Sequence, residues 1–235
     1  MLNWRVPLGV WSGSAAHILG GGASLREFDA SVLEGQRVIG INEAGLTLAP
    51  WCDILFWADT RWLEWNVDRI HLHTGERKVC RQSPYVRTRG CSKETARKVE
   101  RAVTAHGILH LPQNRRAALS EDPARVAGID SGASAINLAW LLGAEPICLH
   151  GFDMKPGHFH DRHVMPSQPE RYASELIPGL RRMAKVLEAR GAVVINCTPG
   201  TALDCFSTAE ACAAQSAGEL EIAVSEPVQL RTKRA

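Results

Sequence analysis

The sequence predicts an α/β fold in which a mainly parallel sheet carries helices on both of its faces. Five apolar runs stand at 15–19, 37–42, 53–59, 146–151 and 192–196, and stretches with helical features lie between several of them. The runs are continuously apolar rather than alternating, which is typical of strands buried on both faces of a parallel sheet. The chain has 235 residues, 45% of them hydrophobic, so it is long enough to bury such a core.

Each predicted element has local sequence support. The first strand leads into the glycine turn 20–22, and residues 26–33 are compatible with one or two helical turns. Ser131 opens an apolar helix that reaches Leu142, and Gly143 closes it. Residues 169–189 place leucines and a methionine at steps of three and four, which predicts an amphipathic helix before the last strand.

The segment 69–128 has a weaker pattern and a different charge. Residues 69–101 hold ten Lys and Arg against three Glu, so this stretch carries +7 while the whole chain carries +2. We predict a basic lid or insertion here, with a helix near 92–105 and a short strand at 107–111. The domain prediction is one nucleotide-binding domain over 1–215, with 69–128 inside it, followed by a flexible tail over 216–235.

Composition excludes several classes of protein. No apolar run is long enough to span a membrane, and the first residues fit a secretory signal poorly. The seven cysteines are odd in number and form no C-x-x-C pair, which argues against a disulfide framework and favours a reducing, cytoplasmic location. The small net charge gives no general argument for nucleic-acid binding.

Two helix starts could hold an anion. In the first, Gly20, Gly21 and Gly22 allow a tight turn, and Ser24 follows; in the second, Ser131, Gly132 and Ser134 combine a small backbone with hydroxyls. Amide N–H groups at a helix start favour phosphate, whereas a plain tight turn and a serine N-cap are the alternatives. The pattern is neither the dinucleotide fingerprint nor a Walker motif. Two such starts in one sheet favour nucleotide binding.

Polar residues also end three of the strands. Asn42, Asp59 and Asp153 would meet at the rim where the carboxyl ends of parallel strands converge, which is where such sheets bind ligands. The two aspartates could accept a ribose hydroxyl or hold a magnesium ion that carries phosphates. Otherwise they are N-caps of the next element.

The stretch 153–163 holds three of the nine histidines. His158, His160 and His163 could act as a general base or contact a phosphate, and Lys155 and Arg162 add positive charge for the same anion. A transition-metal site and a solvated loop are the alternatives.

Aromatic and basic residues offer a further surface. Trp51, Trp57, Trp62 and Trp65 crowd the third strand and its two flanking segments, where they could stack on a base or sugar or simply pack. The basic segment could gather an anionic acceptor, including a polynucleotide.

The order of these motifs resembles a known family. The turn G-G-G-A-S-L, the strand ending at Ile41-Asn42, the strand ending near Asp59, and Ser131-Gly132 before Leu149-His150-Gly151-Phe152-Asp153 are similar to bacterial lipooligosaccharide sialyltransferases. They also resemble the hydroxymethylpterin diphosphokinase-like family, whose small members are frequent in phages and prophages. The resemblance covers roughly 15–210, apart from the basic segment.

The first resemblance implies a Rossmann-like domain that binds a cytidine nucleotide sugar without metal and uses a histidine as base. It places the nucleotide on residues 20–24, Asn42, Ser131 and Gly132, and the base at His163 or His160. The family's paired tyrosines are absent here, with Lys155 and His158 roughly in their place. The second resemblance implies magnesium-dependent phosphoryl chemistry on Asp59 and Asp153.

The leading hypothesis is therefore a cytoplasmic transferase that moves a sugar from a nucleotide sugar to a hydroxyl acceptor. Pyrophosphoryl or nucleotidyl transfer with magnesium is the second hypothesis. A protein that binds a nucleotide without turnover is the third.

Overall fold

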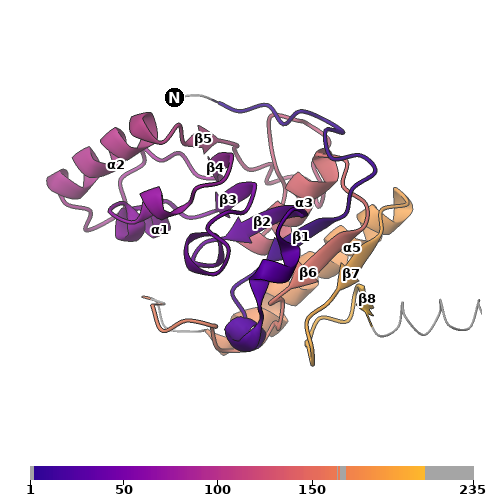
Figure 1. Cartoon of the computed structure of the whole chain (residues 1–235). Coiled ribbons are helices and arrows are strands. Elements are labelled where there is room, and N and C mark those ends of the chain that lie inside the picture. The colour runs from indigo at the N-terminus through magenta and orange to yellow at the C-terminus, as the bar shows by residue number, and fades with distance from the viewer. Residues whose placement is uncertain (1–2, 163, 165–167, 210–235) are drawn as a thin grey trace, which may run out of the picture.

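The chain folds around one parallel sheet. The computed structural model describes residues 3–162, 164 and 168–209. Eight strands pair in the order β5-β4-β3-β2-β1-β6-β7-β8, and every neighbouring pair is parallel (Figure 1). This sheet, with helices on both faces, confirms the predicted fold class.

The strands and helices are short. The strands are β1 Ala16–Leu19, β2 Arg37–Ile41, β3 Ile54–Trp57, β4 Arg77–Cys80, β5 Leu109–His110, β6 Ile147–His150, β7 Val194–Asn196 and β8 Ser207–Thr208. The α-helices are α1 Thr60–Asn66, α2 Lys93–Ala105, α3 Ser131–Leu141, α4 Pro169–Arg171 and α5 Ile177–Ala189. Shorter 3-10 and π turns are η1 Ala23–Glu27, η2 Ala30–Leu33, η3 Ala44–Leu48, η4 Ile70–Leu72 and η5 Tyr172–Leu176. None of these described helices has both the length and the apolar character needed to cross a bilayer.

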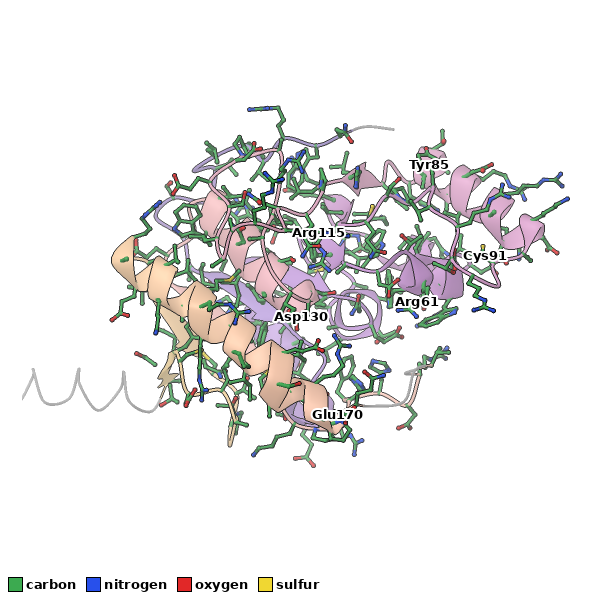
Figure 2. All side chains as sticks on the ribbon, turned by 180° about the vertical axis from the view of Figure 1, so that it is seen from behind. Arg61, Tyr85, Cys91, Arg115, Asp130 and Glu170 are labelled. Atoms are coloured by element: carbon green, nitrogen blue, oxygen red, sulfur yellow. The ribbon has the colours of Figure 1, made fainter. Side chains whose placement is uncertain are left out.

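Each face of the sheet has its own apolar cover. On one face, alternate strand residues such as Ile18, Ile39 and Leu149 pack with α3 and α5, and Figure 2 shows these two helices lying across that face. On the other face, Leu55 and Trp57 pack with α1 and α2, while η1 to η3 cover the part nearer to β1. The strands are buried on both sides, which explains why they are continuously apolar in sequence.

The basic segment 69–128 is built into the sheet. β4 pairs with β3 and β5 pairs with β4, so this segment supplies two strands at one edge. The helix predicted near 92–105 is α2, and the strand predicted at 107–111 contains β5. The predicted tail 216–235 lies outside the described residues.

Two predicted helices differ in detail from the structure. Residues 26–33 were expected to be helical, but the chain forms two separate 3-10 turns, η1 and η2, and Asp29 caps the second. The predicted helix 169–189 is continuous through α4, η5 and α5, with a π turn just before Pro178. A proline lacks the N–H that an α-helical turn requires, and the wider turn accommodates it.

The order of the strands fixes where a ligand can bind. From β1 the chain builds outward to β5, then crosses back to place β6 on the other side of β1. The connections after β1 and β6 therefore lead to opposite faces of the sheet, with η2 on one face and α5 on the other. In open parallel sheets, the crevice at such a switch point, outside the carboxyl ends of the strands, is the usual ligand site.

Candidate functional site

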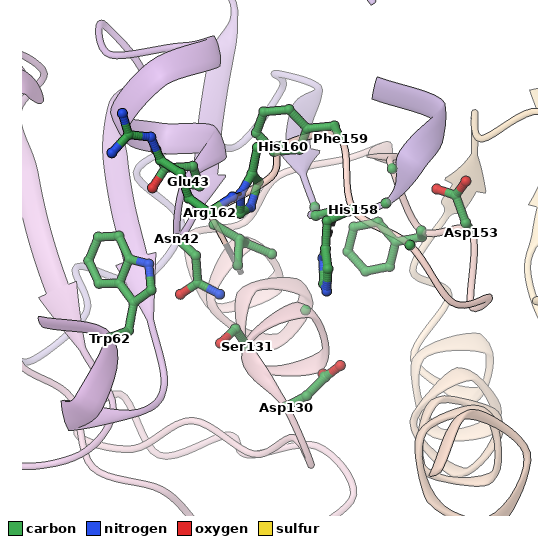
Figure 3. Close-up of a pocket in the computed structure, with 18 of the residues that line it drawn as sticks. Asn42, Glu43, Trp62, Asp130, Ser131, Asp153, His158, Phe159, His160 and Arg162 are labelled. Atoms are coloured by element: carbon green, nitrogen blue, oxygen red, sulfur yellow. Dashed lines mark hydrogen bonds between the residues drawn. The ribbon is translucent and has the colours of Figure 1, made fainter. Parts of the chain in front are cut away.

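A pocket of about 430 Å³ opens at this switch point. It is bounded by the loops after β1, β2 and β6, the start of α3, and one face of α1 (Figure 3). Thirteen of the candidate residues named from the sequence line it: Gly20, Gly21, Gly22, Asn42, Trp62, Trp65, Ser131, Gly132, Asp153, Lys155, His158, His160 and Arg162. Ser24, Asp59 and Ser134 are not among the residues lining it. His163 lies outside the described residues.

Packing explains two of the three glycines in the first turn. A side chain on Gly20 would stand 2.6 Å from the carbonyl oxygen of Gly151, and one on Gly22 would stand 1.8 Å from the Asp153 carboxylate. At Gly21 the nearest atom would be Nδ1 of His158, at an ordinary 3.5 Å. Only Gly21 therefore keeps open backbone toward the pocket without a packing reason.

Ser24 and Asp153 bind each other. The Ser24 amide and hydroxyl both donate to the Asp153 carboxylate, at 3.0 and 2.7 Å. This pair joins the loop after β6 to the start of η1, so both residues act as a clamp between the two loops. The amides of η1 were expected to face a phosphate, but the amide of Ser24 is directed at this carboxylate.

Asp59 and Ser134 have structural partners. Asp59 caps α1 through the amide of Arg61 and pairs with the Arg61 guanidinium. Partial burial raises the pKa of Asp59, but the bonds and charge of Arg61 outweigh this and hold it below its ordinary value. Ser134 is buried and accepts a hydrogen bond from Arg81 at 3.0 Å.

The two aspartates suggested for magnesium do not meet at one site. Asp153 lines the pocket and is held by Ser24, whereas Asp59 is held by Arg61 away from the pocket lining. Within the described part of the chain, no three His, Cys, Asp or Glu side chains are grouped so as to hold a metal ion. The predicted magnesium ligands, Asp59 and Asp153, therefore do not form a site that fits the ion.

The start of α3 forms the floor of the pocket. The N-cap is Asp130, whose carboxylate accepts from the Ala133 amide at 2.8 Å. Burial raises the pKa of Asp130 above its ordinary value. The Ser131 hydroxyl accepts from the Ala58 amide at 3.2 Å, which fixes α3 to the end of β3. Sequence reasoning missed Asp130, although an aspartate just before a helical run is a standard N-cap signal.

Asn42 has an unusual backbone. Its φ of 53° lies in the left-handed region, and its amide donates to the carbonyl of Phe56 at 3.0 Å. A non-glycine residue in this conformation often marks a functional position. The next residue, Glu43, is buried and pairs with Arg69, so the turn after β2 is rigid on its pocket side.

The histidine loop folds over the first glycine turn. The Gly21 carbonyl faces Nδ1 of His158 at 3.2 Å and accepts from the amide of Phe159. Because a carbonyl can only accept, Nδ1 of His158 carries the proton and the neutral ring keeps its lone pair on Nε2. Figure 3 shows this ring projecting into the pocket. His158 therefore has the tautomer of a general base.

His160 has the opposite tautomer. Its Nδ1 accepts from the Arg162 amide at 3.1 Å, so the neutral ring carries its proton on Nε2. This ring is suited to donate a hydrogen bond rather than to take a proton. The ammonium group of Lys155, at the rim, donates a hydrogen bond to the Gly200 carbonyl.

One face of α1 forms a wall that the sequence pattern did not identify as a unit. Trp62, Trp65, Asn66 and Arg69 stand at helical steps of three and four and all line the pocket. Trp62 packs on Trp57, with ring centroids 5.2 Å apart, whereas Trp65 is 44% exposed. The wall is therefore aromatic, with polar groups beside it.

A tyrosine also lines the pocket. Sequence reasoning placed no tyrosine here, but Tyr172 comes from the π turn η5. Burial, together with the charges of Asp130 and Asp153, raises its pKa. The signal was hidden because Tyr172 lies in a helix that follows the histidine loop, and only tertiary packing brings it to the site.

The fold has a counterpart among known structures. That structure is the sialyltransferase CstII from Campylobacter jejuni in complex with a substrate analogue, cytidine-5'-monophosphate. The match has a TM-score of 0.51 and 17% sequence identity, and it covers 84% of this chain and 85% of that chain. The likeness shows a shared fold. No protein-family model and no curated protein sequence matches the chain.

Proposed function

We propose that the chain is a glycosyltransferase-like enzyme that binds a nucleotide sugar in this pocket and transfers the sugar to a hydroxyl acceptor. The observation that carries the proposal is the meeting of Gly21, Ser131 and His158 at the switch point of the sheet. The backbone amide at Gly21 and the start of α3 at Ser131 are suited to bind a phosphate, and the imidazole of His158 faces the same pocket. The shared fold with a sialyltransferase supports the same class.

In this proposal His158 is the general base. Its Nε2 takes the proton of the acceptor hydroxyl while the acceptor oxygen forms a bond to the anomeric carbon. The bond from that carbon to the phosphate oxygen breaks, and the nucleotide leaves with the negative charge. A neutral imidazole in the correct tautomer is suited to this role near neutral pH. His163 stays a predicted alternative for the base.

Donors around the pocket would offset the charge on the departing phosphate. Nε2–H of His160 can donate to a phosphate oxygen, and Lys155 and Arg162 supply fixed positive charge at the rim. Tyr172 adds a hydroxyl to the lining of the pocket. The carboxyl groups of Asp130 and Glu43 also line the pocket and offset part of its positive charge. The donors therefore have to lie close to the phosphate in order to stabilise it.

A panel of ligands tests the proposal directly. Thermal unfolding is followed with nucleoside mono-, di- and triphosphates and with nucleotide sugars, each in chelator and in magnesium. A ligand that binds the folded state raises Tm by mass action, and we expect nucleotide sugars and cytidine-5'-monophosphate to do so in chelator. A shift confined to triphosphates with magnesium would instead support phosphoryl transfer. No shift with any compound would contradict the proposal.

The role of His158 is tested on the donor that binds. His158→Gln should lower the rate of nucleotide release by about 10²- to 10⁴-fold while the ligand-induced rise in Tm stays. His71→Gln is the matched control, because His71 is exposed and is not among the residues lining the pocket. An unchanged rate in His158→Gln would remove this residue as the base, and binding without any nucleotide release would favour a protein that only sequesters its ligand.

A further inference from the structure

Two cysteines stand on neighbouring strands outside the pocket, with Cys148 opposite Ile195 and Cys197 two residues further along. Cys148 lies in β6, and Cys197 follows the last residue of β7. The two strands are parallel, with Leu149 opposite Asn196, and the amide of Cys197 continues the ladder by donating to the Leu149 carbonyl at 2.8 Å. The Cys148 thiol donates a hydrogen bond to the sulfur of Cys197, and that sulfur also lies 3.9 Å from the Ile195 carbonyl.

This pair lies on the side of β6 that faces away from α3 and α5. Ile147 and Leu149 belong to the core on the α3 side, so Cys148 and His150 project from the opposite side. His17 of β1 is the strand partner of Cys148, and its ring nitrogen lies 3.0 Å from that of His150. Cys197 is partly exposed, so a small reagent can approach its sulfur.

We propose that Cys148 and Cys197 form a reversible thiol–disulfide site that reacts with small disulfides such as oxidised glutathione. The Cys197 thiolate attacks one sulfur of the small disulfide, which forms a mixed disulfide and releases one thiol. Cys148 loses its proton to solvent and attacks the protein sulfur of that mixed disulfide. The second small thiol leaves, and the protein gains one internal disulfide while the small disulfide is reduced to two thiols.

The electrostatics fit this order of events. The hydrogen bond from Cys148 lowers the pKa of Cys197 to about 7, so a large share of Cys197 is thiolate at neutral pH. Cys205 is a natural comparison within the same chain, since it is also partly exposed. Burial raises the pKa of Cys205 to about 11. Two accessible thiols of one protein therefore differ in predicted reactivity.

The site is linked to the pocket through one residue. Thr198 follows Cys197 directly, and its hydroxyl accepts from the Phe152 amide at 2.9 Å. Phe152 lines the pocket and lies against Gly132. A disulfide between Cys148 and Cys197 would join β6 to the segment after β7, whose Thr198 holds Phe152 against the floor of the pocket.

Alkylation of the full chain tests the first half of the proposal. The reduced protein is treated with iodoacetamide at pH 7, and each cysteine is followed by mass spectrometry. We expect Cys197 to react at least about tenfold faster than Cys205, because the thiolate is the nucleophile. Cys148→Ala, which removes the hydrogen-bond donor, should slow the reaction of Cys197. Equal rates at Cys197 and Cys205 would overturn the assignment.

Oxidation tests the second half. With oxidised glutathione, peptides that contain Cys148 and Cys197 should appear joined by a disulfide that dithiothreitol reverses. Cys148→Ser and Cys197→Ser should each abolish the joined peptide, and Cys205→Ser, the matched control, should leave it unchanged. A stable glutathione adduct on Cys197 with Cys148 still reduced would show that the sulfurs cannot pair, since a disulfide requires Cα atoms within about 7 Å.

Discussion

At the scale of single residues, neighbouring glycines have different reasons to be glycine. Gly20 and Gly22 are small because the Gly151 carbonyl and the Asp153 carboxylate occupy the space of a side chain. Gly21 has no such neighbour, and its carbonyl orients His158 instead. A glycine-rich turn can therefore contain glycines that packing requires beside one that packing does not require.

Alanine substitutions separate these two reasons. Gly22→Ala should lower the free energy of unfolding by about 1–3 kcal/mol, because the new Cβ overlaps the Asp153 carboxylate. Gly21→Ala should leave the stability within about 1 kcal/mol but reduce the rise in Tm caused by cytidine-5'-monophosphate. Urea unfolding and thermal shift measure the two effects. If Gly21→Ala bound the nucleotide as well as the native chain, Gly21 would not be a binding glycine.

At the scale of elements, the sequence identified the strands that lie in mainly apolar runs. It predicted β1, β2, β3, β5, β6 and β7. It missed β4, half of which is the charged pair Arg77 and Lys78, and the two-residue β8. The residues predicted after β1, β2 and β6 meet in one pocket because parallel topology brings strand ends together, whereas Asp59 after β3 does not line it. Trp62 and Trp65 were candidates for stacking from the sequence, whereas Asn66, Arg69 and Tyr172 were not predicted, since they reach the pocket only through packing between elements.

α1 gives a prediction that separates its two faces. Leu63 is completely buried between α1 and the sheet, whereas Trp65, two residues later, is 44% exposed at the pocket. Leu63→Ala should lower the free energy of unfolding by about 2–5 kcal/mol, because it leaves a cavity. Trp65→Ala should change the stability by less than about 1 kcal/mol and weaken binding of the nucleotide sugar.

Urea unfolding and ligand titration measure the two variants of α1 side by side. A large loss of stability in Trp65→Ala would show that this residue supports the fold rather than the pocket. A native affinity in the same variant would remove the aromatic wall from the binding site.

At the scale of the whole molecule, folding buries two histidines, His73 and His150, that are far apart in the sequence. His73 follows η4, and its Nε2 is 2.9 Å from the carbonyl of Cys52. His150 ends β6 beside His17. Burial lowers the pKa of each ring to about 4, with Lys78 contributing at His73 and His17 contributing at His150. Both rings are therefore neutral in the folded chain at pH values where an unfolded chain binds protons.

This difference predicts how stability depends on pH. Above about pH 6.5 these rings are neutral in both the folded and the unfolded chain, so their burial costs no free energy of deprotonation. Between about pH 6.5 and 4 the unfolded chain takes up protons that the folded chain does not, and stability falls as the pH falls. Each ring contributes up to about 1.4 kcal/mol per pH unit, reduced by any solvent that reaches it.

Urea unfolding at pH 7.5, 6, 5 and 4.5 measures the dependence, and His73→Gln isolates one ring. Glutamine can keep a hydrogen bond to the Cys52 carbonyl but does not titrate, so this variant should lose less stability between pH 6.5 and 4.5 than the native chain. His71→Gln is the matched control, because His71 is exposed and should leave the dependence unchanged. Equal pH dependence in the native chain and His73→Gln would show that His73 binds a proton in the folded state as readily as in the unfolded one.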